Sequence, residues 1–378
     1  MKNILQILTL LLCLGSVPLC RAAAVAKVPA VAPQPMTPEL VRKLAEAGDA
    51  VAQYNLGYCC YRGEVVPQDY AAAARWFRKS ADQGVYQAQF GLALCYREGH
   101  GVPRDDAEAA RWLRKAADQG DAKAQQLLAT CYQSGRGVAQ SVAEAAAWFQ
   151  KAATQGVVRA QYELALCCRE GRGVPKDPAA AARWLQQAAE QHDAQAQFLL
   201  GVLLEAGEGV SQNFPAAAQC YRRAAAQGLA AAQYNLGVLC AQGRGVPQDF
   251  AEAVKWFQLA ARQGDAQAQF NLGLCCEKGQ GLPVQLADAA RWYRLAAEQG
   301  DVRAQVNLAA CLARGQGVPR DAVEAFKWFN IAAAAGDTNA VAARASLQQL
   351  MTAEQIAEGQ RRATAFATLT NPPAAPVQ

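Results

Sequence analysis

One spacing constrains this chain more than any other feature: a tryptophan recurs every 36 residues. The series runs from Trp76 to Trp328 and is interrupted once, at Cys220. Glycines follow the same period from Gly48 onward. Self-similarity at a fixed period of about 20 to 50 residues is typical of repeat proteins, whose copies bury their apolar faces only against their neighbours. The sequence therefore predicts eight tandem repeats over residues 49–336, in place of several unrelated domains.

Each repeat opens with a segment that has the apolar spacing of a helix. In the first copy this segment spans about Asp49 to Tyr61. Ala52, Leu56 and Cys60 share one stripe of it. Leucine recurs at the Leu56 position in all eight copies, and the next residue is always glycine or alanine, which lets a neighbouring helix approach closely. A pair of glycines then ends the helix and turns the chain in most copies.

The second half of each repeat carries the signals of another helix. It begins with Asp, Ser or Asn in seven copies and with Gln285 in the other, and the side chains of the first three types can cap the free amides of a first turn. Ala73, Trp76 and Phe77 form a stripe that is expected to be buried. One repeat cannot bury both stripes alone, so stacked neighbours must complete the core. The predicted fold is an all-α solenoid of helix-turn-helix repeats.

Segments on both sides of the repeats complete the expected organisation. It comprises a signal peptide at 1–26, a Pro/Ala-rich linker at 27–36, an N-terminal capping helix at 37–48, the repeats at 49–336, C-terminal capping helices at 337–369 and a disordered tail at 370–378.

The first 26 residues have the form of a secretory signal. A basic residue, an apolar run of about 11 residues and small residues for cleavage follow one another, and the run is too short to span a bilayer. A lipoprotein interpretation of Cys20 is disfavoured, because Leu19 precedes it in place of a small residue. The protein is therefore expected to be secreted or periplasmic.

Composition limits the classes of partner. The chain of 378 residues is 52% hydrophobic and 18% charged, as in a folded globular protein. Its net charge of +5 is too small for a nucleic-acid-binding surface. Every apolar stretch after the leader is interrupted by polar residues within a few positions, so no membrane span is expected.

The 13 cysteines are a candidate for chemistry. Ten of them occupy two adjacent positions of the first helices: Cys59, Cys60, Cys95, Cys131, Cys167, Cys168, Cys240, Cys275, Cys276 and Cys311. Equivalent positions in stacked helices are about 8–10 Å apart, beyond the limit of about 7 Å between the Cα atoms of a disulfide. We expect them to be small apolar residues at a helix interface. Redox activity is a remote alternative, and Cys220 with Cys240 is the one pair that spans both helix types.

No pattern for catalysis is present. The two histidines, His100 in a turn and His192 at a repeat boundary, have no visible partner. The sequence lacks an ordered Ser/His/Asp set, a phosphate-binding loop and a metal motif. A basic row on the second helices is interpreted as a solvated outer face; it comprises Arg75, Arg111, Arg183, Lys255, Arg291 and Lys327. We expect no enzymatic activity, no cofactor and no metal.

An aromatic ladder on the first helices is the candidate binding surface. It consists of Tyr54, Phe90, Tyr162, Phe198, Tyr234 and Phe270. On a helical wheel its position lies about 160–200° from the Leu56 stripe. With Tyr58, Tyr61 and Arg62 nearby, the ladder is expected to line a concave groove that holds a partner. Packing between successive first helices is the alternative interpretation.

The repeat itself resembles a known family. Residues 52–57 and 232–237 both read AQYNLG, within a pattern A-x-Q-Y-N-L-G-x-x-Y-x-x-G-x-G-V-P-x-D that recurs over residues 48–336. This pattern resembles the Sel1-like repeat, a relative of the tetratricopeptide repeat, in its bacterial secreted or periplasmic type. The resemblance implies a right-handed superhelix of antiparallel helix pairs that serves as an adaptor for protein complexes. It does not extend to the cysteine-rich branch whose repeats carry a disulfide between their two helices, because the cysteines here lie almost wholly on the first helix.

The expected function is that of a non-catalytic scaffold outside the cytoplasm, which holds a protein or peptide partner in the groove of the first helices. The alternative is a binder of a small ligand, such as a cell-wall glycan or peptide stacked on the aromatic ladder. A thiol-active protein is a remote alternative.

Overall fold

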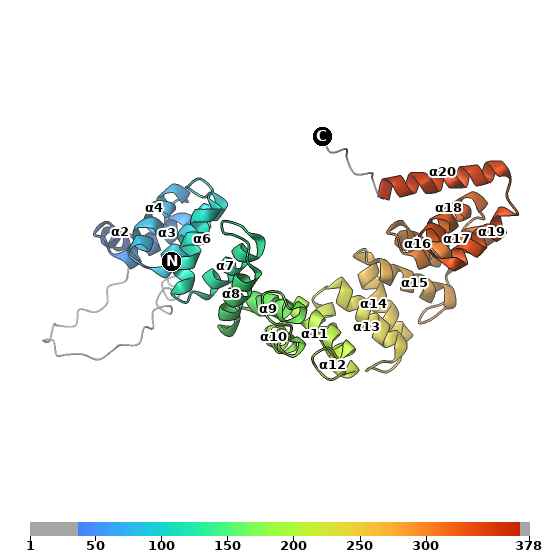
Figure 1. Ribbon diagram of the computed structural model, residues 1–378, viewed down its shortest axis with the longest axis horizontal. Coiled ribbons are helices and arrows are strands. Elements are labelled where there is room, and N and C mark those ends of the chain that lie inside the picture. Colours follow the sequence, from blue (N-terminus) through green and yellow to red (C-terminus); the bar gives the residue numbers. More distant parts are fainter. Residues whose placement is uncertain (1–36, 371–378) are drawn as a thin grey trace. The chain divides into compact units, whose positions relative to one another are not determined.

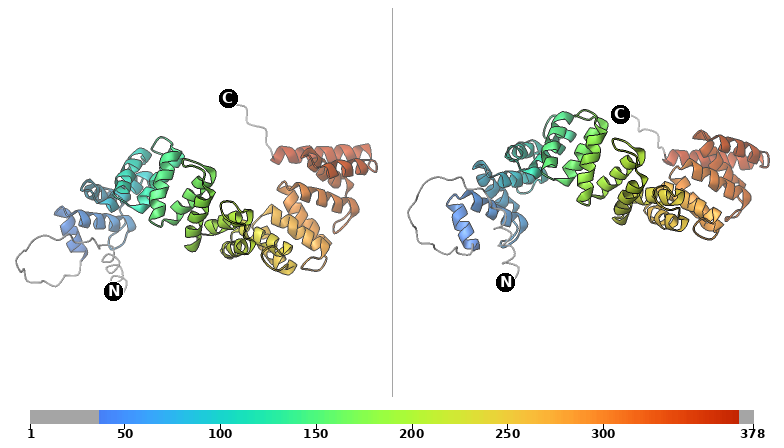
Figure 2. Two further views of the ribbon diagram at one scale, coloured as in Figure 1. Left: turned by 60° about the horizontal axis from the view of Figure 1, so that its bottom comes forward. Right: turned by 90° about the horizontal axis from the view of Figure 1, so that it is seen from below.

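The computed structural model describes residues 37–370, which form 19 α-helices and, within that range, no strand (Figure 1). The chain divides into two compact units, Met1–Val157 and Val158–Gln378. In each unit, helices that are neighbours in sequence pack side by side in tandem pairs (Figure 2). The prediction of an all-α solenoid is confirmed. The predicted signal peptide and linker, and residues 371–378 of the predicted tail, lie outside the described residues.

Every repeat contains the two predicted helices. The first helices are α3 (Ala50–Arg62), α5 (Tyr86–Glu98), α7 (Ala122–Ser134), α9 (Val158–Glu170), α11 (Ala194–Ala206), α13 (Ala230–Gln242), α15 (Ala266–Lys278) and α17 (Val302–Arg314). The second helices are α4 (Tyr70–Asp82), α6 (Asp106–Asp118), α8 (Val142–Thr154), α10 (Pro178–Glu190), α12 (Phe214–Ala226), α14 (Phe250–Arg262), α16 (Leu286–Glu298) and α18 (Ala322–Ala334). Outside the repeats lie α2 (Pro38–Glu46), α19 (Thr338–Gln348) and α20 (Ala353–Thr370).

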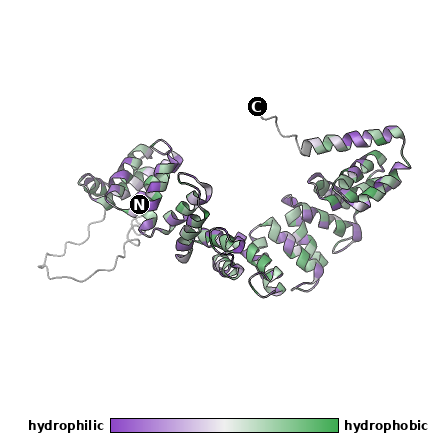
Figure 3. Cartoon of the chain, in the orientation of Figure 1, coloured by the Kyte–Doolittle hydropathy of each residue, from purple (hydrophilic) through white to green (hydrophobic). Residues whose placement is uncertain are grey.

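The second helices begin where the sequence predicts. The Asp69 carboxylate accepts a hydrogen bond from the amide of Ala72 (2.8 Å), and the six other predicted Asp, Ser and Asn caps do the same in their own repeats. Gln285 makes no such bond. Apolar residues recur with the period of a helix, so green and purple residues alternate along the helices in Figure 3. The apolar side of each helix packs inward.

The buried stripe of the second helices agrees with the prediction except at the tryptophan position. Trp112, Trp148 and Trp328 are buried, but the other four tryptophans are only half-buried. The following residue is buried in all eight repeats, from Phe77 to Phe329. The expectation that the tryptophans form the core is therefore wrong for half of the repeats, because these rings lie at the rim of the helix pair. A lysine covers the ring face of Trp76, 4.4 Å from its centre, and of the three buried tryptophans.

The small residue after the conserved leucine faces this buried position. A Cβ atom at Gly237 would lie 2.7 Å from the ring of Phe257, and one at Gly273 would lie 2.6 Å from the ring of Tyr293. At these two glycines a Cβ atom would require the ring to shift, while the repeats with alanine, such as Ala129 beside Phe149, hold the ring in a position that leaves room for one carbon and no more. The predicted need for a small residue at this position is confirmed.

The second glycine of each turn lies against the backbone of the preceding repeat. A Cβ atom at Gly101 would come 2.1 Å from the carbonyl oxygen of Tyr70. The first repeat has Val65 at this position, with φ of 73°, a conformation that is strained for a β-branched residue. Only α2 precedes this repeat, so nothing occupies the space around Val65, which is 60% exposed.

A pair of glutamines joins the two helices of one repeat in the interior, and one of the pair also bonds to the preceding repeat. Gln233 of α13 is 3% exposed; its Nε2 donates to the carbonyl of Ala225 in the preceding repeat (3.2 Å) and its Oε1 accepts from Nε2 of Gln263 (2.8 Å). The same amide-to-amide bond recurs in six other repeats. In the last repeat Ala335 replaces the donor, and the buried Oε1 of Gln305 has no partner. In each complete pair, the buried Nε2 and Oε1 of the first-helix glutamine both have a hydrogen-bond partner.

The C-terminal helix α20 does not extend the alternation of helices. It packs along α18, the second helix of the last repeat, and lies beside it in Figure 1. A capping box begins this helix, since Thr352 and Gln355 exchange hydrogen bonds of 3.0 and 3.2 Å. Within residues 37–370 no helix has the length and apolar character needed to cross a membrane.

Candidate functional site

The aromatic ladder lies on the first helices, and each ring is at least half-buried. Four of its rings touch the buried ring of the same repeat's second helix, at centroid distances of about 6 Å: Tyr54 with Phe77, Phe198 with Tyr221, Tyr234 with Phe257 and Phe270 with Tyr293. Phe270 is 7% exposed, with the guanidinium of Arg303 from the next first helix 4.3 Å above its ring. The ladder therefore packs chiefly on the second helix of its own repeat, whereas the alternative considered from the sequence was packing between successive first helices.

One part of the ladder opens into an exposed surface. Val51, Tyr54 and Tyr58 follow one side of α3, and Tyr54 lies 6.3 Å from Tyr58 between ring centres. Burial raises the pKa of Tyr54, and the nearby hydroxyls of Tyr58 and Tyr86 raise it further. Val51 is 58% exposed, Tyr58 41% and Tyr86 38%. We call these four residues the aromatic patch.

Two members of the aromatic patch were not apparent from the sequence. Val51 and Tyr86 do not belong to any repeated position: most other copies have Gln, Lys, Arg or Ala at the Val51 position and Ala or Val at the Tyr86 position. A periodic pattern identifies only positions that the copies share, so residues unique to the first two repeats give no such signal. Large apolar side chains at helix positions that are otherwise small or polar were the available signal.

Two other predicted site residues have different surroundings. The hydroxyl of Tyr61 is 3.2 Å from Nδ1 of His100, whose ring stacks on Tyr70 at 4.3 Å between centres. The expectation that His100 has no partner is therefore wrong: its turn lies against the second helix of the preceding repeat, which brings the rings together. Arg62 is exposed and pairs with Glu64 (3.2 Å). Tyr61 thus belongs to the junction between the first two repeats.

The cysteines are held as neutral core residues. All 11 within the described residues are free thiols, Cys220 and Cys240 included. Burial raises the pKa of Cys95 to about 12 and those of Cys240, Cys275 and Cys311 to about 11. The pKa of each of the others is also raised, chiefly by burial. Since the thiolate is the reactive form, these environments oppose thiol chemistry.

Other candidate chemistry is sparse in the described part of the chain. No three His, Cys, Asp or Glu side chains within residues 37–370 gather where they could hold a metal ion. The basic row of the second helices is solvated: the side chains of Arg111, Arg183 and Arg291 are 73%, 70% and 81% exposed. Lys327 alone differs strongly, at 15%.

The architecture has clear relatives. The family model described as the Sel1 repeat matches eight consecutive segments: residues 50–85, 87–121, 122–157, 158–193, 194–229, 230–265, 266–301 and 302–337. The chain belongs to the Sel1 repeat family. Sel1-repeat proteins generally mediate protein–protein interaction and are generally non-catalytic scaffolds. No match is found among curated proteins.

Two solved structures of Sel1-repeat proteins are similar over most of the chain. A Sel1 repeat protein from Oxalobacter formigenes is 34% identical, with 83% of this chain and 90% of that one covered and a TM-score of 0.63. A protective antigen present in uropathogenic Escherichia coli strains, with an SLR fold, is 29% identical, with 90% and 91% covered and a TM-score of 0.53.

Proposed function

We propose that this Sel1-repeat protein is a non-catalytic scaffold that holds a protein partner on the first helices of its first two repeats. The observation that carries the proposal is the aromatic patch, in which Tyr58 and Tyr86 are about two-fifths exposed beside the exposed Val51. Tyrosine is enriched among the residues that dominate binding energy at protein interfaces, because it offers a large rigid ring and a polar tip.

The site of action proposed is the periplasm or the cell exterior. The leader sequence of residues 1–26 supports it. So does the similarity to a bacterial protective antigen. Expression of the full sequence in a Gram-negative host, followed by fractionation and intact mass measurement, tests the location: the expected product is periplasmic and lacks about the first 20 to 26 residues. A full-length product in the cytoplasm contradicts this part of the proposal.

A capture experiment tests the function. The protein without its leader is immobilised and exposed to a periplasmic extract, and the retained proteins are identified by mass spectrometry. A patch variant carries Tyr58→Ala and Tyr86→Ala; Tyr54 is left intact because its ring packs on Phe77. A matched control carries Leu259→Ala and Leu295→Ala, which lie on second helices with 42% and 44% exposure.

The proposal expects at least one protein that the native chain and the leucine control retain and the patch variant loses. An identical set of retained proteins for all three chains would contradict it, provided that their helical circular dichroism is equal.

A further inference from the structure

The second helix of the last repeat, α18, binds another helix on its outer face. α20 covers this face: a Cβ atom at Gly359 would lie 2.8 Å from the ring of Phe326, so the two helices are in close contact there. Phe366 packs edge-on against Trp328, with 5.1 Å between ring centres. Arg362 donates to the carboxylate of Glu324 (3.3 Å).

The charged residues of α18 that lie under α20 are largely buried. The side chains of Lys327 and Glu324 are 15% and 17% exposed, and the two pair with each other at 2.8 Å. Lys327 belongs to the basic row whose other arginines are about 70% exposed or more. The difference is the cover that α20 provides.

At the equivalent face, six repeats earlier, no helix of residues 37–370 packs as α20 does: Arg111 is 73% exposed, and Trp112, which is 4% exposed, is covered by Lys115, 3.8 Å from its ring centre. On α6, Glu108, Arg111 and Trp112 occupy the positions of Glu324, Lys327 and Trp328. Arg111 pairs with Glu108 at 2.7 Å, as Lys327 does with Glu324, and in both helices the buried indole N–H has no partner. Elsewhere the carboxylate takes the indole N–H instead, as Glu144 does from Trp148 (3.2 Å).

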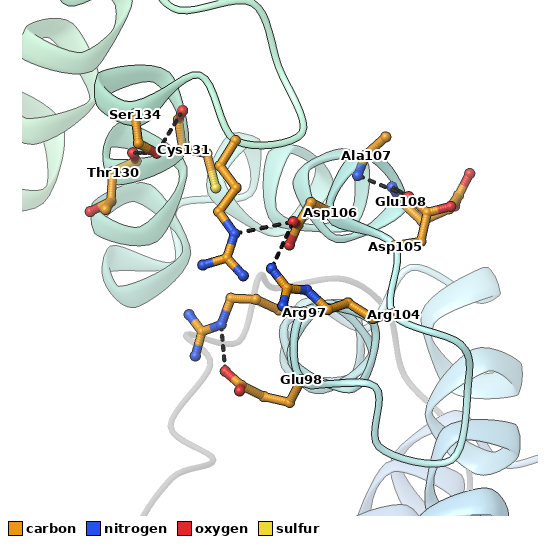
Figure 4. A network of polar contacts seen from close by, with 11 residues as sticks. Arg97, Glu98, Arg104, Asp105, Asp106, Ala107, Glu108, Thr130, Cys131 and Ser134 are labelled. Carbon is orange, nitrogen blue, oxygen red and sulfur yellow. Dashed lines mark hydrogen bonds and ion pairs between the residues drawn. The ribbon is translucent and has the colours of Figure 1, made fainter. Parts of the chain in front are cut away.

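A groove of about 610 Å³ lies over this face of α6. Its floor includes Trp112 and its sides include Arg111, Lys115 and, from the next repeat, the turn at Gly137 and Val138. That turn is held in place by Arg136, whose guanidinium binds Asp106 at the start of α6 (3.1 Å), and Arg104 binds the same carboxylate (3.1 Å; Figure 4). Both arginines hold the pKa of Asp106 below its usual range, so the wall remains in place across the neutral pH range.

We propose that this groove docks an amphipathic helix of a partner protein, with the chemistry that α20 presents to α18. That chemistry is a basic residue for Glu108 and, one turn further on, an aromatic residue for the edge of Trp112. α6 has Ala110 in place of Phe326, so the partner residue at the Gly359 position has room for a side chain. α6 has Arg114 and Lys115 where α18 has Asn330 and Ile331, so carboxylates on the partner helix add to the attraction. This surface is separate from the aromatic patch, and the inference stands independently of the proposed function.

The test uses a fluorescein-labelled synthetic peptide of residues 353–370, titrated with the full-length protein without its leader and followed by fluorescence anisotropy. The protein's own α20 occupies α18 and has the advantage of being tethered, so the peptide reports on α6. Ala107→Arg places a long side chain at an exposed position that lines the groove. Ala143→Arg is the matched control, since it makes the same change at the same position of α8, which is also exposed.

The inference predicts saturable binding that Ala107→Arg weakens at least about tenfold and Ala143→Arg changes less than about twofold. A peptide with Phe366→Ala should also bind at least about tenfold more weakly. Hydrogen exchange should show protection of α6 and the turn of residues 135–141 by the native peptide. No saturable binding, equal loss in both arginine variants, or protection confined to α18 would each overturn the inference.

Discussion

At the scale of the residue, the glutamine contacts show what residue type alone does not reveal. The capping residues and the small residue beside each buried ring could be predicted, because residue type and position along the helix are enough to assign them. The glutamines recur in the sequence as plainly, but their bonds join residues 8 and 30 positions apart in neighbouring helices. Such partners can be assigned only once the helices are stacked, and the missing donor at Ala335 therefore had no meaning beforehand.

Ala335→Gln should stabilise the last repeat. The new side chain can donate to the buried Oε1 of Gln305, and satisfying a buried acceptor is worth about 1 kcal/mol. The free energy of unfolding in urea should rise by about this amount. Ala334→Gln, at the adjacent exposed position, is the control and should change it by less than about 0.5 kcal/mol. Equal effects of the two changes would show that the unpaired oxygen costs nothing.

Val65 offers a second test at this scale. Glycine adopts φ of 73° without strain, so Val65→Gly should stabilise the first repeat by about 1 kcal/mol. The reverse change, Gly101→Val, should prevent the turn from forming, because its Cβ would meet the Tyr70 carbonyl at 2.1 Å. Thermal melting of both variants checks the pair. A destabilised Val65→Gly chain would mean that the strain is absent or offset.

At the scale of the element, the repeat of residues 193–228 should be the weakest. His192 adopts φ of 66° in the turn before it, where the other repeats have glycine. Cys220 replaces the tryptophan and is half-buried, so one large ring is missing from this helix pair, while Tyr221 is fully buried and bonds Glu205 (2.8 Å). Each repeat contacts only its neighbours, so a weak one opens locally.

Native-state hydrogen exchange measures this directly. Residues 193–228 should lose protection before residues 229–300, and His192→Gly should recover about 1 kcal/mol of the difference. Uniform protection over both segments would show that the buried Tyr221 already compensates for the lost tryptophan.

The site was less predictable than the helices at this scale. The ladder position was found because it recurs, and that recurrence reflects packing on the second helix at least as much as binding. Two exposed members of the aromatic patch, Val51 and Tyr86, were missed because each occurs once at its repeat position. C-terminal capping helices were expected, but the face on which α20 packs depends on Gly359 and Phe366, which lie outside the repeat and so outside its pattern.

At the scale of the whole molecule, the cysteines should behave as apolar residues. Burial raises the pKa of every one, and no two of those described are bonded. Thiol titration without reductant should therefore find few reactive groups in the native protein and most of the 11 after denaturation. One thiol or none after denaturation would mean that the protein carries disulfides, and the stacking of the first helices would need revision.

The central claim is that the first helices of repeats 1 and 2 bind a protein partner through the aromatic patch. The most direct measurement is the dissociation constant of a purified partner, obtained by the capture experiment, for the native chain, the Tyr58→Ala/Tyr86→Ala variant and the Leu259→Ala/Leu295→Ala control. Loss of two exposed interface tyrosines should raise the dissociation constant at least about tenfold, with the thermal midpoint almost unchanged, while the leucine control stays within about twofold. A dissociation constant that is the same for all three chains would contradict the claim.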